Sequence, residues 1–304
     1  MTRRYSFHTL DVFTDRKFGG NPLAVVLDAD DLTTEEMQTI TREFNLSETI
    51  FVRKPRDSAN TASVRIFFPG AEIPFAGHPT VGCAIFLAER DRKPGCPFET
   101  EIRLEEVAGL VPVKVTRIAG ASRAQFTAPV IPHAAKGPAP AANEAAAALG
   151  LKPSEIGFGG HRTGHFAGGP SFLYIPVASR DALSRAKPAE PGWSAMMQAS
   201  GTVGAYLYTP GGDHADTAFR ARMLAPGGGI PEDPATGSAT AILAGQLLAS
   251  GALDEGTNRF RLEQGYEMGR PSDLWMEADV EGPRLTAVRV AGQAIPVMSG
   301  ELEL

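Results

Sequence analysis

The chain has 304 residues, of which 43% are hydrophobic and 21% charged, a composition typical of a soluble globular protein with about two domains. Its net charge of −6 and the lack of any run of Lys or Arg argue against a nucleic-acid-binding protein. Its two cysteines are too few for a disulfide framework, no apolar stretch reaches the ~18 residues of a membrane span, and no signal peptide is apparent, so we expect a cytoplasmic protein without a membrane partner.

The first elements predicted along the chain are two strands, at residues 5–13 and 23–28, on either side of a loop rich in Gly and charged residues. A helix follows, because Thr33 and Glu36 have the spacing of a capping box and the next apolar residues recur at helical intervals. The segment ETIFV resumes as a strand. This order places Glu48 at a helix-to-strand junction, where a glutamate is most often a solvated residue.

A second helix is predicted to begin within PFAGHPTVG. Pro79 disfavours a helical backbone at the preceding His78 and itself suits the first position of a helix. Gly77 and His78 would then lie at the helix N-terminus, where free backbone N–H groups and the helix dipole favour an anion. The alternative is that the glycine only allows a turn.

The middle of the chain predicts a connector. Residues 132–155 are rich in Pro and Ala and contain one short helix, with Asn143 as its N-cap and Gly150 at its C-terminal end. The predicted boundaries are 1–125 for an N-terminal domain, 126–290 for a C-terminal domain, and 291–304 for a C-terminal strand that packs on either domain.

His161 and His165 are four residues apart, a spacing that suits a metal site when both histidines lie on one helix. Flanking glycines argue against a helix here, and no third ligand is apparent, so no metal is predicted. The same segment is not a dinucleotide fingerprint, because Arg162 stands where the third glycine belongs.

A second helix N-terminus is predicted in GGGIPEDPATGSATA, where Gly237 and Ser238 precede an Ala- and Leu-rich helix. It offers a second group of free backbone N–H donors for a small carboxylate. In the alternative interpretation, Asp233 is a turn residue and Ser238 is a helix cap, with its oxygen directed toward its own backbone.

These two helix-start motifs belong to an internal duplication. A shift of 157 residues aligns 65–85 with 222–242 with seven identities in 21 positions and no gap. The shift is as long as a domain, which indicates two related domains; chance matching of Gly- and Pro-rich loops is the alternative. At this shift, with local slips of a few residues expected, the polar residues are not duplicated. The pairs are Glu48 with Ala205, His78 with Ala235, and Asp233 with Ala76.

Four segments resemble the signature blocks of the PhzF-like phenazine-biosynthesis family: GNPLAVV, LSETIFV, FFPGAEIPFAGHPTVG and APGGGIPEDPATGSA. The resemblance implies an α+β fold similar to that of diaminopimelate epimerase and proline racemase. Such a fold has two pseudo-symmetric domains, each a barrel-like β-sheet around a central helix, and an active site in the cleft between them. The cysteine pair of the epimerases is missing here, because Cys83 lies within a predicted helix and residues 222–242 contain no cysteine.

The resemblance also implies roles for individual residues. Glu48 matches the glutamate that shuttles the proton in this family, and His78, Asp233 and Ser238 match residues that line the reacting centre. The backbone at Gly77 and Gly237 would bind the substrate carboxylate, with Asn21 of GNPLAVV also in the substrate site. The family acts without metal or organic cofactor and is commonly homodimeric.

The expected function is a cofactor-independent isomerase that moves a proton on a small carboxylate by glutamate acid–base catalysis. Two other classes stay open at this stage. One is a serine-dependent hydrolase acting through Ser238, and the other is a non-catalytic metabolite-binding or interaction protein.

Overall fold

The computed structural model describes residues 2–93, 95–202, 204–228 and 230–304. The chain forms two compact units, which we call unit 1 (Met1–Thr127 and Ala291–Leu304) and unit 2 (Ala128–Val290). Gly229, within the motif GGGIPEDPATGSATA, lies outside the described residues. No helix of the described ranges is both long and apolar enough to cross a bilayer.

Unit 1 is a closed sheet wrapped around a helix. Its strands are β1 (Arg4–Val12), β2 (Asn21–Val26), β3 (Glu48–Arg53), β4 (Ala62–Phe68), β5 (Ala71–Ile73), β6 (Phe98–Glu106), β7 (Gly109–Ile118), β8 (Ala121–Thr127) and the later part of β17 (Arg284–Glu303). Its helices are η1 (Ala29–Asp31), α1 (Thr34–Phe44) and α2 (Gly77–Glu89). The pairings run β17–β1–β2–β3–β4–β6–β7–β8 and return to β17, which closes a barrel.

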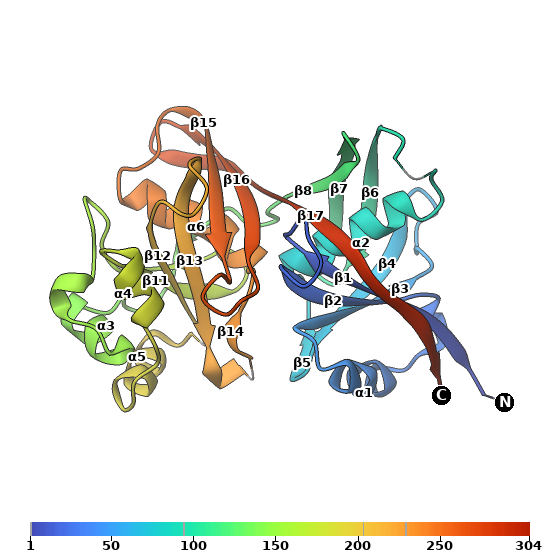
Figure 1. Ribbon diagram of the computed structural model, residues 1–304, viewed down its shortest axis with the longest axis horizontal. Helices are drawn as coiled ribbons and strands as arrows, with labels where there is room; N and C mark the ends of the chain where they lie inside the picture. The colour runs from blue at the N-terminus through green and yellow to red at the C-terminus, as the bar shows by residue number, and fades with distance from the viewer. Residues whose placement is uncertain (1, 94, 203, 229) are drawn as a thin grey trace. The chain divides into compact units, whose positions relative to one another are not determined.

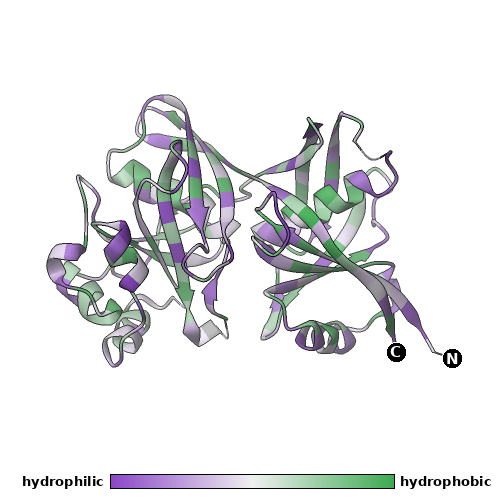
Figure 2. Cartoon of the chain, viewed as in Figure 1, coloured by the Kyte–Doolittle hydropathy of each residue, from purple (hydrophilic) through white to green (hydrophobic). Residues whose placement is uncertain are grey.

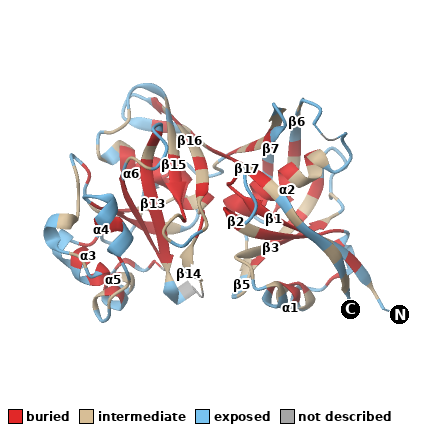
Figure 3. Ribbon diagram, in the orientation of Figure 1, coloured by how far each residue is buried: buried red, intermediate tan, exposed pale blue. Residues whose placement is uncertain are grey.

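Helix α2 occupies the interior of this barrel. It contacts β1, β2, β3, β6, β7 and β8, and most of its residues are buried. A helix that is surrounded by strands has no solvent face, so its sequence is apolar or small on all sides, as Figures 2 and 3 show. The prediction that Cys83 lies inside this helix is confirmed.

Helix α1 packs on the outside of the same sheet, next to β3 and β4 (Figure 1). The predicted capping box is confirmed, with Thr33 and Glu36 bonded to each other's backbone N–H groups. The buried face of α1 carries Met37 and Ile40, which pack with Phe51 and Phe67 of the sheet. Strand β3 begins at Glu48, as predicted.

Unit 2 repeats this plan around helix α6. Its strands are β9 (His133–Ala134), β10 (Gly164–Ala167), β11 (Ser171–Pro176), β12 (Ala205–Pro210), β13 (Thr217–Ala225), β14 (Ile230–Asp233), β15 (Gly256–Gln264), β16 (Ser272–Glu281) and the first part of β17. Its helices are α3 (Ala142–Leu149), η2 (Pro153–Glu155), α4 (Arg180–Arg185), α5 (Gly192–Ser200), η3 (Pro226–Gly228) and α6 (Gly237–Ala249). Helix α6 is buried nearly throughout and contacts β9, β10, β11 and β16.

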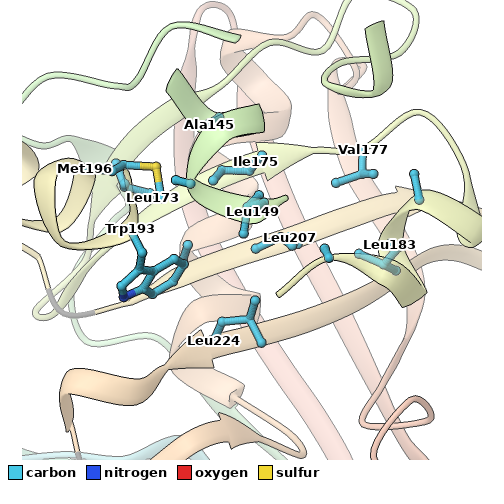
Figure 4. Packing of buried hydrophobic residues seen from close by; sticks show 14 residues of the cluster. Ala145, Leu149, Leu173, Ile175, Val177, Leu183, Trp193, Met196, Leu207 and Leu224 are labelled. Carbon is cyan, nitrogen blue, oxygen red and sulfur yellow. The ribbon is translucent and has the colours of Figure 1, made fainter. Parts of the chain in front are cut away.

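A second core in unit 2 lies between the sheet and its outer helices. Trp193 and Met196 of α5 pack with residues of α3, α4, β11, β12 and β13, including Leu149, Leu183 and Leu207 (Figure 4). The predicted helix in the connector exists, and Gly150 ends it in a left-handed conformation. Its predicted N-cap is wrong, because Ala141 precedes the helix and Asn143 lies within it.

The duplication is real, but its alignment without gaps is wrong. Glu48 begins β3 and Ala205 begins β12, which agrees with the shift of 157. Gly77 and Gly237 begin helices of equal length, however, at a shift of 160. The extra residues fall in the short segment around β5 and β14, so His78 corresponds to Ser238 and not to Ala235.

Candidate active site

In unit 1, the polar residues predicted for the site meet at the N-terminus of α2. The Nδ1 atom of His78 lies 3.0 Å from the Oε2 atom of Glu48, and the two side chains are 4% and 16% exposed. Glu48 is held by β3 and His78 is the second residue of α2, so a strand end and a helix start bring them together.

His78 is neutral in this environment. Burial lowers the pKa of His78 to about 3, and a hydrogen bond with the backbone of Pro22 acts in the opposite direction. A neutral imidazole has one donor and one acceptor nitrogen, and its contact with Glu48 can orient the carboxyl group. The pair therefore combines a carboxyl group with a neutral imidazole.

The other two predicted residues of unit 1 lie beside this pair in the fold. Asn21 is fully buried at the start of β2, and two residues later Leu23 is in register with Glu48 on the parallel strand β3. Gly77 is the first residue of α2 and is buried. The N-cap residue Ala76 has no side-chain cap, so backbone N–H groups of the first turn remain for other acceptors.

In unit 2, the predicted residues gather at the N-terminus of α6. Asp233 is the last residue of β14, Gly237 is the first residue of α6, and Ser238 is the second. The carboxylate of Asp233 accepts a hydrogen bond from the hydroxyl group of Thr236, the N-cap residue of α6. The interpretation of Ser238 as a helix cap is thus wrong, since the helix begins one residue before it.

The predicted position of Pro79 in its helix is also wrong. We expected it at the first position of the helix, but α2 begins two residues earlier, at Gly77. Because α2 is enclosed by strands, packing within the barrel determines where its first turn begins, and the local preference of Pro79 does not. His78 consequently lies inside the first turn and is directed by it.

One residue that organises the unit 2 site was not among the predicted site residues. The side-chain amide of Gln264, at the end of β15, donates to the backbone carbonyl of Asp233 and to the hydroxyl of Thr236, at 2.8 and 3.0 Å. Its oxygen accepts from the backbone N–H of Thr236 at 3.1 Å. One buried amide therefore fixes both the strand end and the helix start. Its signal was the repeat of LEE at 104–106 as LEQ at 262–264.

His161 and His165 do not form a metal site with each other through a helix, because both lie in extended segments. The Nδ1 atom of His161 bonds the hydroxyl of Tyr208 and that of His165 bonds the carbonyl of Gly137, each at 2.9 Å. Both rings are mostly buried and serve internal hydrogen bonds of unit 2.

One group in the described ranges has the spacing of a cation site: His214, Glu263 and Asp273, with ligand atoms within 4.8 Å of one another. Glu263 already accepts bonds from the backbone N–H groups of Asp213 and His214 and from the Thr217 hydroxyl. The guanidinium Nε of Arg220 also lies 3.1 Å from its carboxylate. Buried and saturated with donors, Glu263 fits an internal anchor better than a metal ligand.

Comparison with known proteins decides the family. A family model described as phenazine biosynthesis-like protein, PhzC-PhzF, matches residues 10–300. The chain belongs to this phenazine biosynthesis-like family. Its members include a trans-2,3-dihydro-3-hydroxyanthranilate isomerase of Pseudomonas aeruginosa, which is 35% identical over 99% of this chain and 100% of that protein. An uncharacterized isomerase of Mesorhizobium japonicum is 42% identical, with 99% of each chain covered.

Solved structures agree on the fold of this chain. A PhzF-family protein of Bacillus anthracis superposes with a TM-score of 0.84 at 24% identity, covering 99% of each chain. A hydroxyproline epimerase of Agrobacterium vitis gives a TM-score of 0.60 at 15% identity, covering 99% of this chain and 92% of the other. The predicted α+β epimerase-like fold, with a barrel-like sheet around a central helix, is confirmed.

Proposed function

We propose that this protein is a cofactor-independent isomerase that transfers a proton between two carbons of a small carboxylate, with Glu48 as the acid–base group. The contact between Glu48 and His78, 3.0 Å long and placed at the uncapped start of α2, is the observation that carries the proposal. A carboxylate removes a proton from carbon efficiently when it is positioned in a partly dry site.

The glutamate, and not the histidine, is the base in this scheme. Burial lowers the pKa of His78 to about 3, so the ring has little affinity for a proton near neutral pH. His78 instead orients the Glu48 carboxyl group and assists the passage of the proton. A neutral imidazole suits this task because it can donate at one nitrogen and accept at the other.

The remaining residues bind the substrate in our proposal. Backbone N–H groups at Gly77 and Gly237 begin helices whose N-caps make no side-chain cap bond, and such groups attract carboxylates. They would also stabilise the charge that develops as the C–H bond breaks. Asp233, Ser238 and Asn21 would orient the polar groups of the substrate.

The names of the relatives support a proposal for the substrate class. Several similar proteins are named as isomerases of trans-2,3-dihydro-3-hydroxyanthranilate, a cyclic amino carboxylate. We infer that the substrate of this protein is a cyclic or amino-acid-like carboxylate of similar size, and that the enzyme works as a homodimer. That compound is therefore the first probe in a screen of small carboxylates.

The test is Glu48→Gln, measured in deuterium oxide by NMR with trans-2,3-dihydro-3-hydroxyanthranilate and with other carboxylates that raise the melting temperature. The variant keeps the shape but loses the base, so turnover should fall by ~10²-fold or more. Binding should stay within about tenfold. Glu43→Gln, on the exposed part of α1, is the matched control and should keep full activity.

The route of the proton gives a second criterion. A single base that removes and returns a proton works on one face of the substrate and sometimes returns the same proton, so product should contain partial deuterium. Activity should persist in EDTA. An active Glu48→Gln protein, or efficient racemisation of an L-amino acid with full deuterium in the inverted product, would contradict the one-glutamate mechanism.

A further inference from the structure

A buried acid lies beneath the first turn of α2 and takes no part in the mechanism proposed above. Glu106 is the last residue of β6, and its side chain is 2% exposed. Its Oε1 atom lies 2.6 Å from the hydroxyl oxygen of Thr80, which is in the same turn of α2 as Gly77 and His78. Its other oxygen, Oε2, has no hydrogen-bond partner among the described residues.

The two contacts of the Thr80 hydroxyl group indicate the protonation state of Glu106. The Thr80 hydroxyl also lies 2.7 Å from the backbone carbonyl of Ala76, the N-cap residue of α2. A carbonyl oxygen can only accept, and a hydroxyl group has one proton to donate. With a single proton, Thr80 forms two separate two-centre hydrogen bonds only if it donates to Ala76 and accepts from Glu106. In that arrangement the Glu106 carboxyl group carries a proton.

The duplication provides an independent argument. β6 and β15 are equivalent strands of nine residues, and their last residues are Glu106 and Gln264. Gln264 holds the start of α6 through three hydrogen bonds to Asp233 and Thr236. A protonated glutamate has nearly the shape of a glutamine and, like it, one donor side and one acceptor side. Unit 2 therefore has a permanently neutral group where unit 1 has an acid.

We propose that Glu106 is a positioning residue that fixes the first turn of α2 as a neutral carboxylic acid, the part that Gln264 plays as an amide in unit 2. Through Thr80 and Ala76 it holds the backbone that presents Gly77 and His78. The inference rests on the proposed function only in assigning that turn to substrate binding. The protonation of Glu106 can be tested without any substrate.

The surroundings of Glu106 favour the neutral form. Burial raises the pKa of Glu106 to about 8. On α2 the nearest titratable group is the Cys83 thiol, whose pKa is raised by burial, so it stays uncharged. Glu105 is bonded to the loop after β3, and Arg65 to Glu72.

Cations border Glu106 as well, and their charge acts against the effect of burial. Arg53, Lys54 and Arg56 border the same cavity as Glu105 and Glu106, and Arg56 is paired with Glu105. Ionisation of Glu106 would remove the donor to Thr80 and place a negative charge under the turn that we expect to bind an anion. Both effects would weaken binding of a carboxylate at alkaline pH.

The first experiment compares wild type, Glu106→Gln and Glu106→Leu by ¹³C NMR of protein labelled at the glutamate side-chain carboxyl carbon. Wild type should show one carboxyl resonance that stays protonated at pH 7, titrates near pH 8 and is missing in Glu106→Gln. Glu101→Gln, on the exposed part of the same strand, is the control and should leave that resonance unchanged. A Glu106 carboxyl group that titrates below pH 6 would overturn the proposal.

The second experiment follows thermal unfolding against pH. Because the folded protein binds this proton more tightly than the unfolded chain, wild-type stability should fall as pH rises from ~4.3 toward 8 and then level off. Glu106→Gln lacks this dependence, so its melting temperature relative to wild type should increase over the same range. Equal pH dependence in both proteins would contradict the assignment.

The third experiment measures kcat/KM against pH with a substrate that the enzyme turns over, and it tests whether Glu106 positions the first turn of α2. Glu106→Gln preserves a donor to Thr80, so its kcat/KM at pH 7 should stay within about threefold of wild type. Its kcat/KM should not show the decline that wild type shows above pH 8. Glu106→Leu should lose about tenfold or more at every pH. Equal activity of the Gln and Leu variants would show that the hydrogen bond positions nothing, even if the carboxyl resonance titrates as expected.

Discussion

At the scale of single residues, two buried glutamates, Glu105 and Glu263, make equivalent hydrogen bonds in the two units. Glu105 accepts hydrogen bonds from the backbone N–H groups of Arg56 and Asp57, and Glu263 accepts them from Asp213 and His214. In each unit the glutamate ties the loop between two strands to a third strand. Such a carboxylate is stabilised only as an anion, because its partners all donate.

We expect Glu263→Gln to destabilise the protein in a pH-dependent way. Burial acts to raise the pKa of Glu263, but bonds from the backbone of His214 and Asp213 and from the Thr217 hydroxyl outweigh it and bring the pKa to about 2. A folded-state pKa below the unfolded one stabilises the protein above ~pH 4.3, and this contribution is lost as pH falls toward 2. The free energy of unfolding at pH 7 should decrease by roughly 2 kcal/mol.

Urea unfolding at pH 7 and pH 3 measures this effect, and the difference between variant and wild type should shrink at the lower pH. Glu277→Gln, a surface-paired glutamate on β16, is the control and should cost under ~1 kcal/mol at either pH. A deficit in Glu263→Gln that is the same at both pH values would mean that packing, and not the carboxylate charge, is responsible.

At the scale of elements, the predictions succeeded where the signal was local. The capping box of α1 and the left-handed Gly150 after α3 depend on residues within a few positions of each other, and both are present. The starts of α2 and α6 were misplaced because strands enclose those helices, and packing overrides the local preferences of Pro79 and Ser238. The assignment of Glu48 and His78 to one site came from the family resemblance, since neither residue type nor spacing indicates it. The contact between them is a finding of the structure.

The fit of α2 inside its barrel gives a prediction at this scale. A Cβ atom added at Gly82 would lie 2.6 Å from a methyl group of Leu23 and 2.7 Å from one of Val12, both fully buried. Gly82→Ala should therefore destabilise the protein by about 1–3 kcal/mol in spite of the better helix propensity of alanine. Chemical denaturation gives the free energy of unfolding.

A double-mutant cycle separates crowding from other effects of this substitution. Leu23→Ala leaves a cavity beside Gly82, so the double variant should be more stable than the sum of the single effects predicts, by at least ~0.5 kcal/mol. Strict additivity would show that Gly82 does not owe its identity to the close approach of α2 to β1 and β2.

At the scale of the whole molecule, the duplication and the fold were predicted from the sequence. The alignment without gaps paired the wrong polar residues. Arg65 with Glu72 and Arg222 with Glu232 form equivalent bidentate pairs, although the second pair is separated by three more residues than the first. A gap of that length cannot be placed from seven identities alone. The equivalent positions at Glu106 and Gln264 became visible only with the strands in register.

Strand β17 provides a test at this largest scale. Its later part, at residues 291–304, pairs with β1 and completes the unit 1 barrel, although unit 2 precedes it in the chain. Deleting these residues would leave the backbone of β1 unpaired along one edge. We expect unit 1 to lose hydrogen-exchange protection while α6 in unit 2 stays protected. A synthetic peptide of residues 291–304 should restore protection; uniform protection without it would contradict the expectation.

This order of the chain also has a consequence for biosynthesis. The residues of β1 to β8 leave the ribosome first, but the strand that closes their barrel is translated only after the residues 128–290 of unit 2. At ~5–20 residues per second, the nascent barrel waits roughly 10 to 30 s with an open edge. During that interval the open edge can pair with another nascent chain on the same messenger RNA. We therefore expect the yield of native protein to depend more on polysome density and chaperone supply than on the stability of the folded protein.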